Sequence, residues 1–573
     1  MDYRNRALEW NEQADEATKA ALVGMTDAEL EESFYTELAF GTAGLRGIIG
    51  PGTNRINAYV VRRATQGLAD YLCSIPGAKE RGVAIAYDSR LYSDTFALET
   101  ALVLANNGIR TYLFERLHAV PQLSFAIRHF NCIAGVVITA SHNPPAYNGY
   151  KVYWEHGGQL GPVQADAVLE KINRVGYFEA AAMQREEALK QGLLTMIGRE
   201  VDEAYYAATT TLLLQPELLL EHGKKLKIVY TPLHGSGSIP VQEILKRVGV
   251  TNVRVVAEQA EPDPKFPTVK APNPEDPNAF TLAMRLANET GADCILATDP
   301  DADRLGIAVR EKNGAFTVLS GNQIGCLLLH YILSTLHAQG KLPKNALVVK
   351  SIVSSRLADA ICARFHVQLD DVLTGFRFIS EKIDESQRTG AHTFLFGFEE
   401  SYGFLAGGFS RDKDAICAAM LAAELCTAYH LRHMTLQDAL TEVYEDYGFF
   451  KESVKSYTLA GKAGMEKIAS AMEALRVSPL FTLGNIEVEA IEDYKERKRQ
   501  TLATGAQEPL TLPHSDMIRL LLKGGAWVVV RPSGTEPKLK LYIGANAPTE
   551  PEVDALLNTL MQDADAKISA LLA

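Results

Sequence analysis

The chain has 573 residues, of which 47% are hydrophobic and 22% are charged, a balance that is typical of a globular protein with a sizeable core. This length predicts about three to five domains. The formal net charge of −13, with no long lysine or arginine run to offset it, argues against a general nucleic-acid binder, although an acidic protein can still hold a cationic cleft for a small anion.

The seven cysteines indicate the cell compartment. They are scattered, odd in number and never in CxxC spacing, and most lie in apolar runs, as buried free thiols do. This pattern predicts a reduced, cytoplasmic protein. The N-terminus opens as a polar, helix-like segment without the apolar core of a signal peptide, and no run of about 18 apolar residues predicts a membrane span.

In chain order, the first informative stretch is Phe40-Gly41-Thr42-Ala43-Gly44-Leu45-Arg46-Gly47. Its glycines indicate a loop whose backbone approaches a ligand closely, and Arg46 is a candidate phosphate contact. A flexible turn with a surface arginine explains the pattern equally well. A strand signal at 83–86, a helix capped by Ser93 and a strand near 110–114 follow. Their alternation predicts an α/β layer with helices on both faces.

The stretch Thr139-Ala140-Ser141-His142-Asn143-Pro144 carries the strongest signal in the first quarter of the chain. It follows an apolar, β-branched run at 133–138, which predicts a buried strand, and the prolines 144 and 145 then force the backbone out of regular structure. Ser141 is therefore expected on a fixed turn at the carboxyl end of a strand, where open α/β sheets bind ligands. A hydroxyl there is a good phosphoryl acceptor or nucleophile, although a plain tight turn is the alternative. Lys151 lies within reach of the same cleft.

Residues 164–200 are predicted to be helical and polar, and they carry no strong chemical signal. A second α/β block begins with a strand at 226–230, followed by a strand near 253–256. The stretch from Pro262 to Pro277 holds six prolines, which predicts a long irregular loop with a functional role. His234 is either a ligand or acid–base group or, as we favour, a turn histidine satisfied by the backbone.

The loop after the strand 294–297 carries aspartates at alternate positions: Asp299, Asp301 and Asp303. Three close carboxylates suit a hard divalent cation, whereas a purely solvated acidic turn would leave them to repel one another. An EF-hand does not fit, because its sixth position would be Arg304 instead of glycine and its twelfth Arg310 instead of glutamate. Mg²⁺ is favoured over Ca²⁺, because only three protein oxygens are offered and Mg²⁺ takes the rest from phosphate and water.

A third α/β block is predicted from about Phe316, with a strand at 346–350. Gly375 and Arg377, in a loop further along, are candidates for substrate binding. After a strand at 393–396 comes Gly397-Phe398-Glu399-Glu400-Ser401-Tyr402-Gly403. Glu399 and Ser401, two residues apart, can each bind one of a sugar's vicinal hydroxyls. A glycine-bounded turn with exposed acids is an equally good explanation. The run Arg411-Asp412-Lys413-Asp414 then opens an apolar helix.

The chain changes character from about Leu436, where a helix near 464–475, a strand-rich middle and a final helix at 551–572 predict a smaller α+β domain. After a strand at 527–530 stands Arg531-Pro532-Ser533-Gly534-Thr535-Glu536-Pro537-Lys538. Two hydroxyls, a glycine that exposes backbone N–H groups and flanking cations make a good phosphate nest. A plain turn is the alternative.

Taken together, these loops resemble the α-D-phosphohexomutase superfamily. Its Thr-Ala-Ser-His-Asn-Pro, Asp-x-Asp-x-Asp-Arg, Gly-x-Glu-Glu-Ser and Arg-x-Ser-Gly-Thr-Glu-Pro motifs stand here in the family's order. The opening glycine loop and the length look most like the phosphoglucomutase/phosphopentomutase subgroup. The resemblance implies three related α/β domains with mixed sheets and a C-terminal α+β domain around a central cleft. The expected domains are 1–198 with the phosphoserine loop, 199–313 with the metal loop, 314–438 with the sugar loop and 439–573 with the phosphate loop.

The resemblance also implies a role for each site residue. Ser141 matches the phosphorylated serine, and Asp299, Asp301 and Asp303 match the Mg²⁺ ligands, with the seryl phosphate as a further ligand. Glu399 and Ser401 match the sugar-hydroxyl pair, and Arg531, Ser533, Gly534 and Thr535, with Lys538 beside them, match the clamp on the non-reacting phosphate. Arg46, Lys151 and Arg304 match cationic positions around the reacting phosphate. Lys151 and His142 are the candidates for the general acid and base.

The implied activity is a phosphosugar mutase that interconverts glucose 1-phosphate and glucose 6-phosphate. It would use one Mg²⁺ per chain, with glucose 1,6-bisphosphate as intermediate and activator. Phosphomannose or pentose phosphates remain open as substrates, and a phosphoserine-dependent phosphatase or a non-catalytic sugar-phosphate sensor are alternatives of other classes. The expected partners are small sugar phosphates, not nucleic acid or membrane, and monomer and dimer are both open.

Overall fold

The computed structural model describes residues 2–41, 44–459, 461–533 and 538–573, which fold into two compact units. The first unit runs as far as Ser320 and also contains residues 380–396 and 401–435. The second unit contains residues 321–379, 397–400 and the chain from Leu436 onward. A third α/β region of the chain therefore contributes residues to both units.

Three short helices at the start of the first unit share one hydrophobic cluster, which is rich in aromatic rings. They are α1 (Tyr3–Gln13), α2 (Glu16–Val23) and α3 (Asp27–Phe34). The rings of Trp10 and Phe34 lie 5.6 Å apart, and Trp10 also meets Tyr59 at 5.3 Å. Tyr59 belongs to the following helix, so the cluster fastens the N-terminal helices to the first α/β layer.

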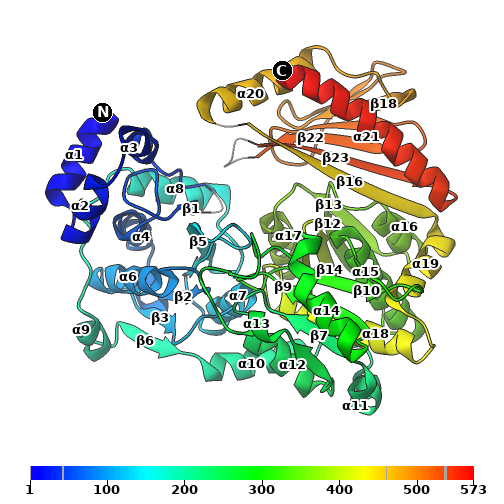
Figure 1. Ribbon diagram of the computed structural model, residues 1–573, viewed down its shortest axis with the longest axis horizontal. Coiled ribbons are helices and arrows are strands. Elements are labelled where there is room, and N and C mark those ends of the chain that lie inside the picture. Colours follow the sequence, from blue (N-terminus) through cyan, green and yellow to red (C-terminus); the bar gives the residue numbers. More distant parts are fainter. Residues whose placement is uncertain (1, 42–43, 460, 534–537) are drawn as a thin grey trace. The chain divides into compact units, whose positions relative to one another are not determined.

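The first sheet has six strands in the order β1-β5-β4-β2-β3-β6 (Figure 1). They are β1 (Leu45–Ile48), β2 (Val83–Tyr87), β3 (Thr111–Phe114), β4 (Ala134–Ile138), β5 (Tyr147–Trp154) and β6 (Leu194–Ile197). β2, β3, β4 and β6 run parallel, whereas β5 is antiparallel to β4 and β1 is antiparallel to β5. Every side chain of β4 is buried, as the apolar run predicts.

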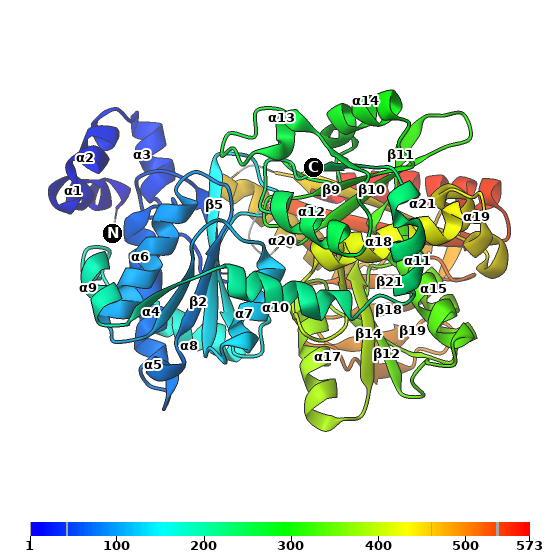
Figure 2. The same cartoon turned by 90° about the horizontal axis from the view of Figure 1, so that it is seen from below.

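Helices cover both faces of this mixed sheet, with α4 and α6 on one side of β2 and α7 on the other (Figure 2). Val83 and Ile85 of β2 share a core with α4 and α6, whereas Ala84 and Ala86 pack with α7. The predicted α/β layer is confirmed. The helices are α4 (Ala58–Leu72), α5 (Ala78–Arg81), α6 (Ser93–Asn106), α7 (Val120–His129), α8 (Pro162–Ile172), α9 (Arg185–Lys190) and α10 (Arg199–Thr210).

Two local predictions for this region are wrong. The sequence predicts helix throughout 164–200, but β6 lies in this stretch and pairs in parallel with β3 at the edge of the sheet. Ser93 does not cap α6, because Tyr92 takes the N-cap position with φ of 63°. The hydroxyl of Ser93 donates instead to Asp88 Oδ1, at 2.7 Å, because that carboxylate is fixed at the end of β2.

Gly44 shows how closely the first glycine loop packs on the sheet. It has φ of +80°, and a Cβ built on it would lie 1.9 Å from the carbonyl oxygen of Tyr150 in β5. We therefore expect Gly44→Ala to destabilise the protein by roughly 2 kcal/mol or more, because both the backbone conformation and the contact exclude a side chain. Urea unfolding measures the effect. Gly77→Ala is the matched control, since Gly77 has a similar φ of +75° but open space around it, and equal losses for the two variants would contradict the contact argument.

The second sheet, also in the first unit, has the order β11-β10-β9-β7-β8. Its strands are β7 (Ile228–Thr231), β8 (Val253–Val255), β9 (Cys294–Thr298), β10 (Leu305–Arg310) and β11 (Phe316–Val318), and its helices are α11 (Pro216–His222), α12 (Ser238–Arg247), α13 (Ala257–Ala260) and α14 (Thr281–Thr290). β7, β8 and β9 are parallel, and β10 and β11 are antiparallel additions. The sequence places Phe316 at the start of a third block, but β11 pairs with β10 of the second sheet.

The proline-rich stretch between α13 and the 3₁₀ turn Pro277–Phe280 is irregular, as predicted. His234 is the turn histidine that we favour. Its Nδ1 lies 3.2 Å from the Glu261 carbonyl oxygen and its Nε2 lies 2.9 Å from Thr268 Oγ1, so both ring nitrogens are satisfied.

The third α/β region contains α15 (Gly321–Ala338), β12 (Ala346–Ser351), α16 (Leu357–Arg364), β13 (Gln368–Val372), α17 (Phe376–Thr389), β14 (Thr393–Glu399), β15 (Gly403–Ala406), α18 (Ala415–His430) and α19 (Leu436–Tyr447). β12 and β13 pair in parallel within the second unit. In the first unit, almost every side chain of α18 is buried, which agrees with the apolar helix predicted after Lys413.

The C-terminal part of the second unit is an antiparallel sheet that packs against two helices, α20 (Gly461–Val477) and α21 (Glu550–Leu572). The main strand order is β16-β23-β22-β21-β18-β19-β20, with β17 paired to β18. The strands are β16 (Phe449–Thr458), β17 (Thr482–Leu483), β18 (Ile486–Asp493), β19 (Lys498–Thr501), β20 (Gln507–Pro509), β21 (Ile518–Leu522), β22 (Trp527–Pro532) and β23 (Lys538–Ala547). The expected α+β domain is present. Across the ranges that the structure describes, no helix combines the length and apolar character needed to cross a bilayer.

Candidate active site

Ser141 lies on a sharp turn at the carboxyl end of β4. Its φ of 53° places it in the left-handed region, which a residue with a side chain adopts only when its surroundings hold it there. Its backbone N–H donates to Thr139 Oγ1 at 2.8 Å, and its hydroxyl donates to Asp299 Oδ2 at 2.8 Å. The turn therefore aims the hydroxyl at a loop of the second sheet.

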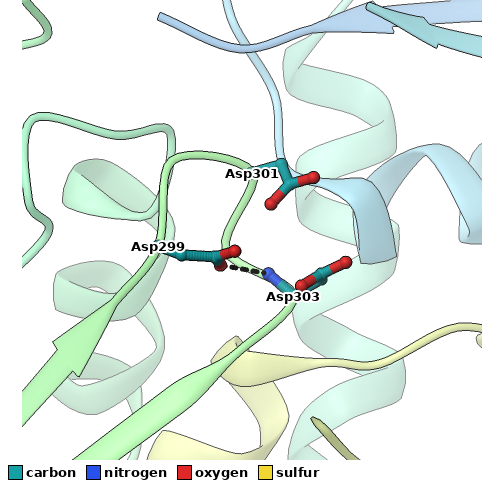
Figure 3. A group of neighbouring side chains, drawn as sticks. All are labelled: Asp299, Asp301 and Asp303. Carbon is teal, nitrogen blue, oxygen red and sulfur yellow. Dashed lines mark hydrogen bonds between the residues drawn. The ribbon is translucent and has the colours of Figure 1, made fainter. Parts of the chain in front are cut away.

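That loop joins the antiparallel strands β9 and β10 and carries the three aspartates (Figure 3). Asp299, Asp301 and Asp303 are each at most 1% exposed, and they offer carboxylate oxygens that all lie within 4.8 Å of one another. Ala302 turns the chain with φ of 48°, and the N–H of Asp303 donates to Asp299 Oδ1 at 3.2 Å. The hairpin thus holds three carboxylates around one point.

The chemistry of this acidic trio fits a divalent cation. Asp301 Oδ1 and Asp303 Oδ1 are buried and accept no hydrogen bond from the part of the chain that the structure describes. Burial, together with the neighbouring carboxylates Asp301 and Asp303, raises the pKa of Asp299 well above its ordinary value. Buried carboxylate oxygens without donors are the ligands that Mg²⁺ prefers in proteins. The donor set could therefore hold a metal ion, and the choice of Mg²⁺ stays a prediction.

Two lysines compensate part of this negative charge. Lys151, from β5, places Nζ 3.0 Å from Asp301 Oδ2, and Lys413 places Nζ 3.0 Å from Asp303 Oδ2. Burial alone would raise the pKa of Asp301, but Lys151 lowers it, and the balance lies below the ordinary value. Lys151 was predicted at this site, whereas Lys413 was noted only at the start of an apolar helix.

Lys413 is held at the site by its own loop. Asp412 accepts the hydroxyl of Tyr153 at 2.7 Å, and the N-cap residue Asp414 accepts the hydroxyl of Tyr205 at 2.7 Å. One sequence signal could have identified Lys413. It stands between two aspartates directly before an apolar helix, where three charged side chains exposed to solvent are not expected.

His142 and Arg46 approach the serine turn from two sides. His142 Nδ1 lies 3.3 Å from Ser141 Oγ, and Arg46 donates from Nη1 to Asn143 Oδ1 at 3.0 Å. Burial, followed by the positive charges of Arg304 and Arg46, lowers the pKa of His142 well below its ordinary value. The imidazole is therefore neutral near pH 7, with a nitrogen able to take a proton. Arg304 follows the trio and pairs with Glu275.

The remaining candidates fall into a second group. Arg531, at the end of β22, donates to Thr374, which precedes Gly375 in the loop before α17, and Arg377 lies over the Phe378 ring at 4.4 Å. The N–H of Ser533 donates to the carbonyl oxygen of Lys538 at 2.7 Å. Glu399 is a buried residue at the end of β14. Ser401 belongs to the first unit, and Gly534 and Thr535 lie outside the described residues.

The structure therefore brings one set of predicted residues together in the first unit: Arg46, Ser141, His142, Lys151, Asp299, Asp301, Asp303 and Arg304. In the second unit Arg531, at the end of β22, contacts Thr374 in the loop before α17. The contact of Arg531 with Thr374 was not predicted.

Comparison with known proteins agrees with this arrangement. Four family models match in order: Phosphoglucomutase/phosphomannomutase, alpha/beta/alpha domain I at residues 37–177, domain II at 203–314, domain III at 320–447 and the C-terminal domain at 476–561. A phosphoglucomutase of Staphylococcus saprophyticus is 39% identical over 525 residues, which cover 90% of this chain and 92% of the relative.

Two solved structures share the fold. A putative phosphomannomutase from Thermus thermophilus superposes with a TM-score of 0.67 at 22% identity, over 93% of this chain and 99% of that one. An Aspergillus fumigatus N-acetylphosphoglucosamine mutase, solved with GlcNAc-6P and magnesium, has a TM-score of 0.52 at 13% identity, over 99% of both chains.

Three α/β/α domains followed by a C-terminal domain, with a serine aimed at an acidic trio, define a class of mutases that act as intramolecular phosphotransferases. The chain belongs to the phosphoglucomutase/phosphomannomutase family.

Proposed function

We propose that the protein interconverts glucose 1-phosphate and glucose 6-phosphate through a phosphoserine at Ser141 and a bound glucose 1,6-bisphosphate. The observation that carries the proposal is the hydroxyl of Ser141, which lies 2.8 Å from Asp299 Oδ2 at the edge of the acidic trio. The choice of glucose rests on the Staphylococcus relative, whose name states that sugar.

The reaction exchanges one P–O bond for another in each half. Phosphorylated Ser141 gives its phosphoryl group to a free sugar hydroxyl, whose proton passes to a base. The bisphosphate then presents its other phosphate, which returns to the Ser141 oxygen. No water enters, so the two halves balance without net hydrolysis.

The residues around Ser141 would have three roles: binding of the metal ion, stabilisation of negative charge and transfer of the hydroxyl proton. Asp299, Asp301 and Asp303 would hold Mg²⁺, which when bound neutralises charge on the transferred phosphoryl group. Arg46, Arg304 and Lys151 add fixed positive charge around the same group. The neutral ring of His142 and the amine of Lys151 are the candidates for moving the hydroxyl proton.

The second group of residues would bind the substrate away from the reacting phosphate. Arg531, Ser533, Gly534, Thr535 and Lys538 would clamp the non-reacting phosphate. Glu399 and Ser401 would bind sugar hydroxyls, with Gly375 and Arg377 as further contacts. An arginine can pair with a phosphate through two parallel hydrogen bonds, and the sugar contacts must accept both orientations of the bisphosphate.

Arg531→Ala tests the clamp. We expect KM for glucose 1-phosphate to rise by about 10–100-fold, since a charge-assisted contact contributes roughly 1.5–3 kcal/mol. Steady-state kinetics measures the change. The control is Arg497→Ala, which removes an arginine of the same domain that hydrogen-bonds only the Leu510 carbonyl among the described residues. An unchanged KM for Arg531→Ala would contradict the clamp.

The activity itself is tested with glucose 1-phosphate, Mg²⁺ and a trace of glucose 1,6-bisphosphate. We expect glucose 6-phosphate without inorganic phosphate, and the bisphosphate should remove any lag. Inorganic phosphate without isomerisation would identify a phosphatase, and binding without turnover a sensor. Comparison of kcat/KM for the 1-phosphates of glucose, mannose, ribose and N-acetylglucosamine identifies the preferred sugar.

The compartment stays a prediction. All seven cysteines are free thiols, and only Cys73 is exposed, which supports the cytoplasmic location inferred from their spacing.

A further inference from the structure

Arg90, which no sequence signal singled out, lies beneath the turn that carries Ser141. Its side chain is fully buried, and its guanidinium donates to four carbonyl oxygens between Ser141 and Tyr147. Nη1 donates to the carbonyl oxygens of Pro144, at 2.9 Å, and Tyr147, at 3.0 Å. Nη2 donates to the carbonyl oxygens of Ser141 and Asn143, the latter at 2.5 Å.

These contacts supply the turn with N–H donors from outside its own backbone. The stretch from Ser141 to Tyr147 contains two prolines, which have no N–H to donate, and the carbonyl oxygens of Ser141 and Asn143 accept from Arg90 in a buried setting. A buried carbonyl without a donor destabilises the fold, and so does the left-handed conformation of Ser141. A planar guanidinium with fixed donors can satisfy several carbonyls in one geometry, which a lysine ammonium cannot.

Arg90 is itself fixed from two sides. Asp88 Oδ2 lies 3.3 Å from Arg90 Nε, and the same oxygen accepts the hydroxyl of Thr139 at 2.6 Å. Thr139 Oγ1 in turn accepts the N–H of Ser141. The opposite face of the guanidinium lies 5.1 Å from the ring of Phe266, which comes from the proline-rich loop of the second sheet. The support thus reaches Ser141 through both its N–H and its carbonyl.

We propose that Arg90 is a positioning residue for phosphoryl transfer, which holds the backbone of the Ser141 turn so that the hydroxyl stays against the acidic trio. Among the described residues, Arg90 makes no hydrogen bond to the hydroxyl of Ser141 or to the trio, and it holds the turn through four carbonyl oxygens. The inference rests on the proposed function, because it assigns a role within that reaction. It also gives the proline-rich loop a role, since the ring of Phe266 packs against the guanidinium.

The experiment compares Arg90→Lys with Arg310→Lys. Arg310 is the matched control, because it also donates to carbonyl oxygens, those of Ala287, Ala292 and Gly314, and lies over a ring, that of Phe316, at 4.4 Å. For Arg90→Lys we expect kcat to fall by about 10²-fold, as for a misplacement of about 1 Å, with KM changed by less than about threefold. Both substitutions should lower the melting temperature by similar amounts. Arg310→Lys, however, should leave kcat unchanged.

A second measurement separates positioning from general stability. Methylguanidinium added to Arg90→Ala should restore part of kcat and of the single-turnover transfer from phosphorylated Ser141 to glucose 1-phosphate. Full kcat in Arg90→Lys, an equal loss of kcat in both lysine variants, or absence of any rescue would overturn the proposal. Failure of both Arg90 variants to fold would assign the residue to domain stability alone and also overturn it. A wild type without mutase activity or phosphorylated Ser141 would instead remove the proposed function.

Discussion

Replacement of Ser141 by alanine should lower kcat by at least about 10⁴-fold, because the variant lacks the hydroxyl that is proposed to carry the phosphoryl group. Folding should be preserved, since the hydroxyl contributes contacts only to Asp299 and His142 among the described residues. The substitution removes only the hydrogen bond that Asp299 accepts from the hydroxyl. All three carboxylates stay in place, so the trio should still bind Mg²⁺. A coupled assay for glucose 6-phosphate measures the loss, and incorporation of labelled phosphate from glucose 1,6-bisphosphate should disappear with it.

Ser89→Ala is the control for this variant. Ser89 stands in the neighbouring loop after β2 and is buried, and its hydroxyl has no hydrogen-bond partner among the described residues. The substitution should therefore leave kcat near that of the wild type. Substantial turnover by Ser141→Ala, or labelled phosphate on a different residue, would refute the phosphoserine.

Asp301→Asn should have the second largest effect, a fall in kcat of about 10³-fold together with weaker Mg²⁺ binding. Asp301 combines one oxygen that accepts from Lys151 with another that is buried without a donor. An amide removes a negative charge from the trio and turns an NH₂ group towards either the cation site or the lysine. Activity measured against Mg²⁺ concentration, with calorimetric titration of Mg²⁺, measures both effects.

The control for Asp301→Asn is Asp293→Asn, which also replaces an aspartate by an amide but at the other end of β9. Asp293, just before β9, accepts the N–H of Lys227 at 2.8 Å and lies away from the trio along the strand. Asp293→Asn should keep both kcat and Mg²⁺ affinity. An Asp301→Asn enzyme with wild-type Mg²⁺ dependence would exclude the trio as the metal site.

The strand signals that led to the site were predictable from the sequence because they depend on local pattern. The runs at 133–138 and 294–297 are continuous and apolar, and each ends in a loop whose residues cannot extend the strand. By contrast, β5 escaped prediction, because Tyr147–Trp154 follows two prolines and contains Asn148-Gly149, a turn signal. Its pairing with β4 and β1 overrides the local preference.

The residues that support the site were harder to predict than the residues that form it. Lys413 and Arg90 are recognised by their contacts with Asp303 and with the Ser141 turn, partners that lie far from them in the sequence. No local pattern separates such a cation from one on a solvated surface. The same holds for Arg531, whose contact with Thr374 joins two loops that no spacing rule relates.

The position of Lys413 along the chain has a consequence for biosynthesis. Asp303 leaves the ribosome long before the lysine that pairs with it, and so do Tyr153 and Tyr205, which anchor the aspartates on either side of that lysine. Nascent domains fold in order from the N-terminus, so the two leading sheets can form while the three carboxylates still lack the charge of Lys413. Completion of this charge cluster therefore awaits translation of the loop before α18, and a chain truncated ahead of it would lack one of the cations that compensate the acidic trio.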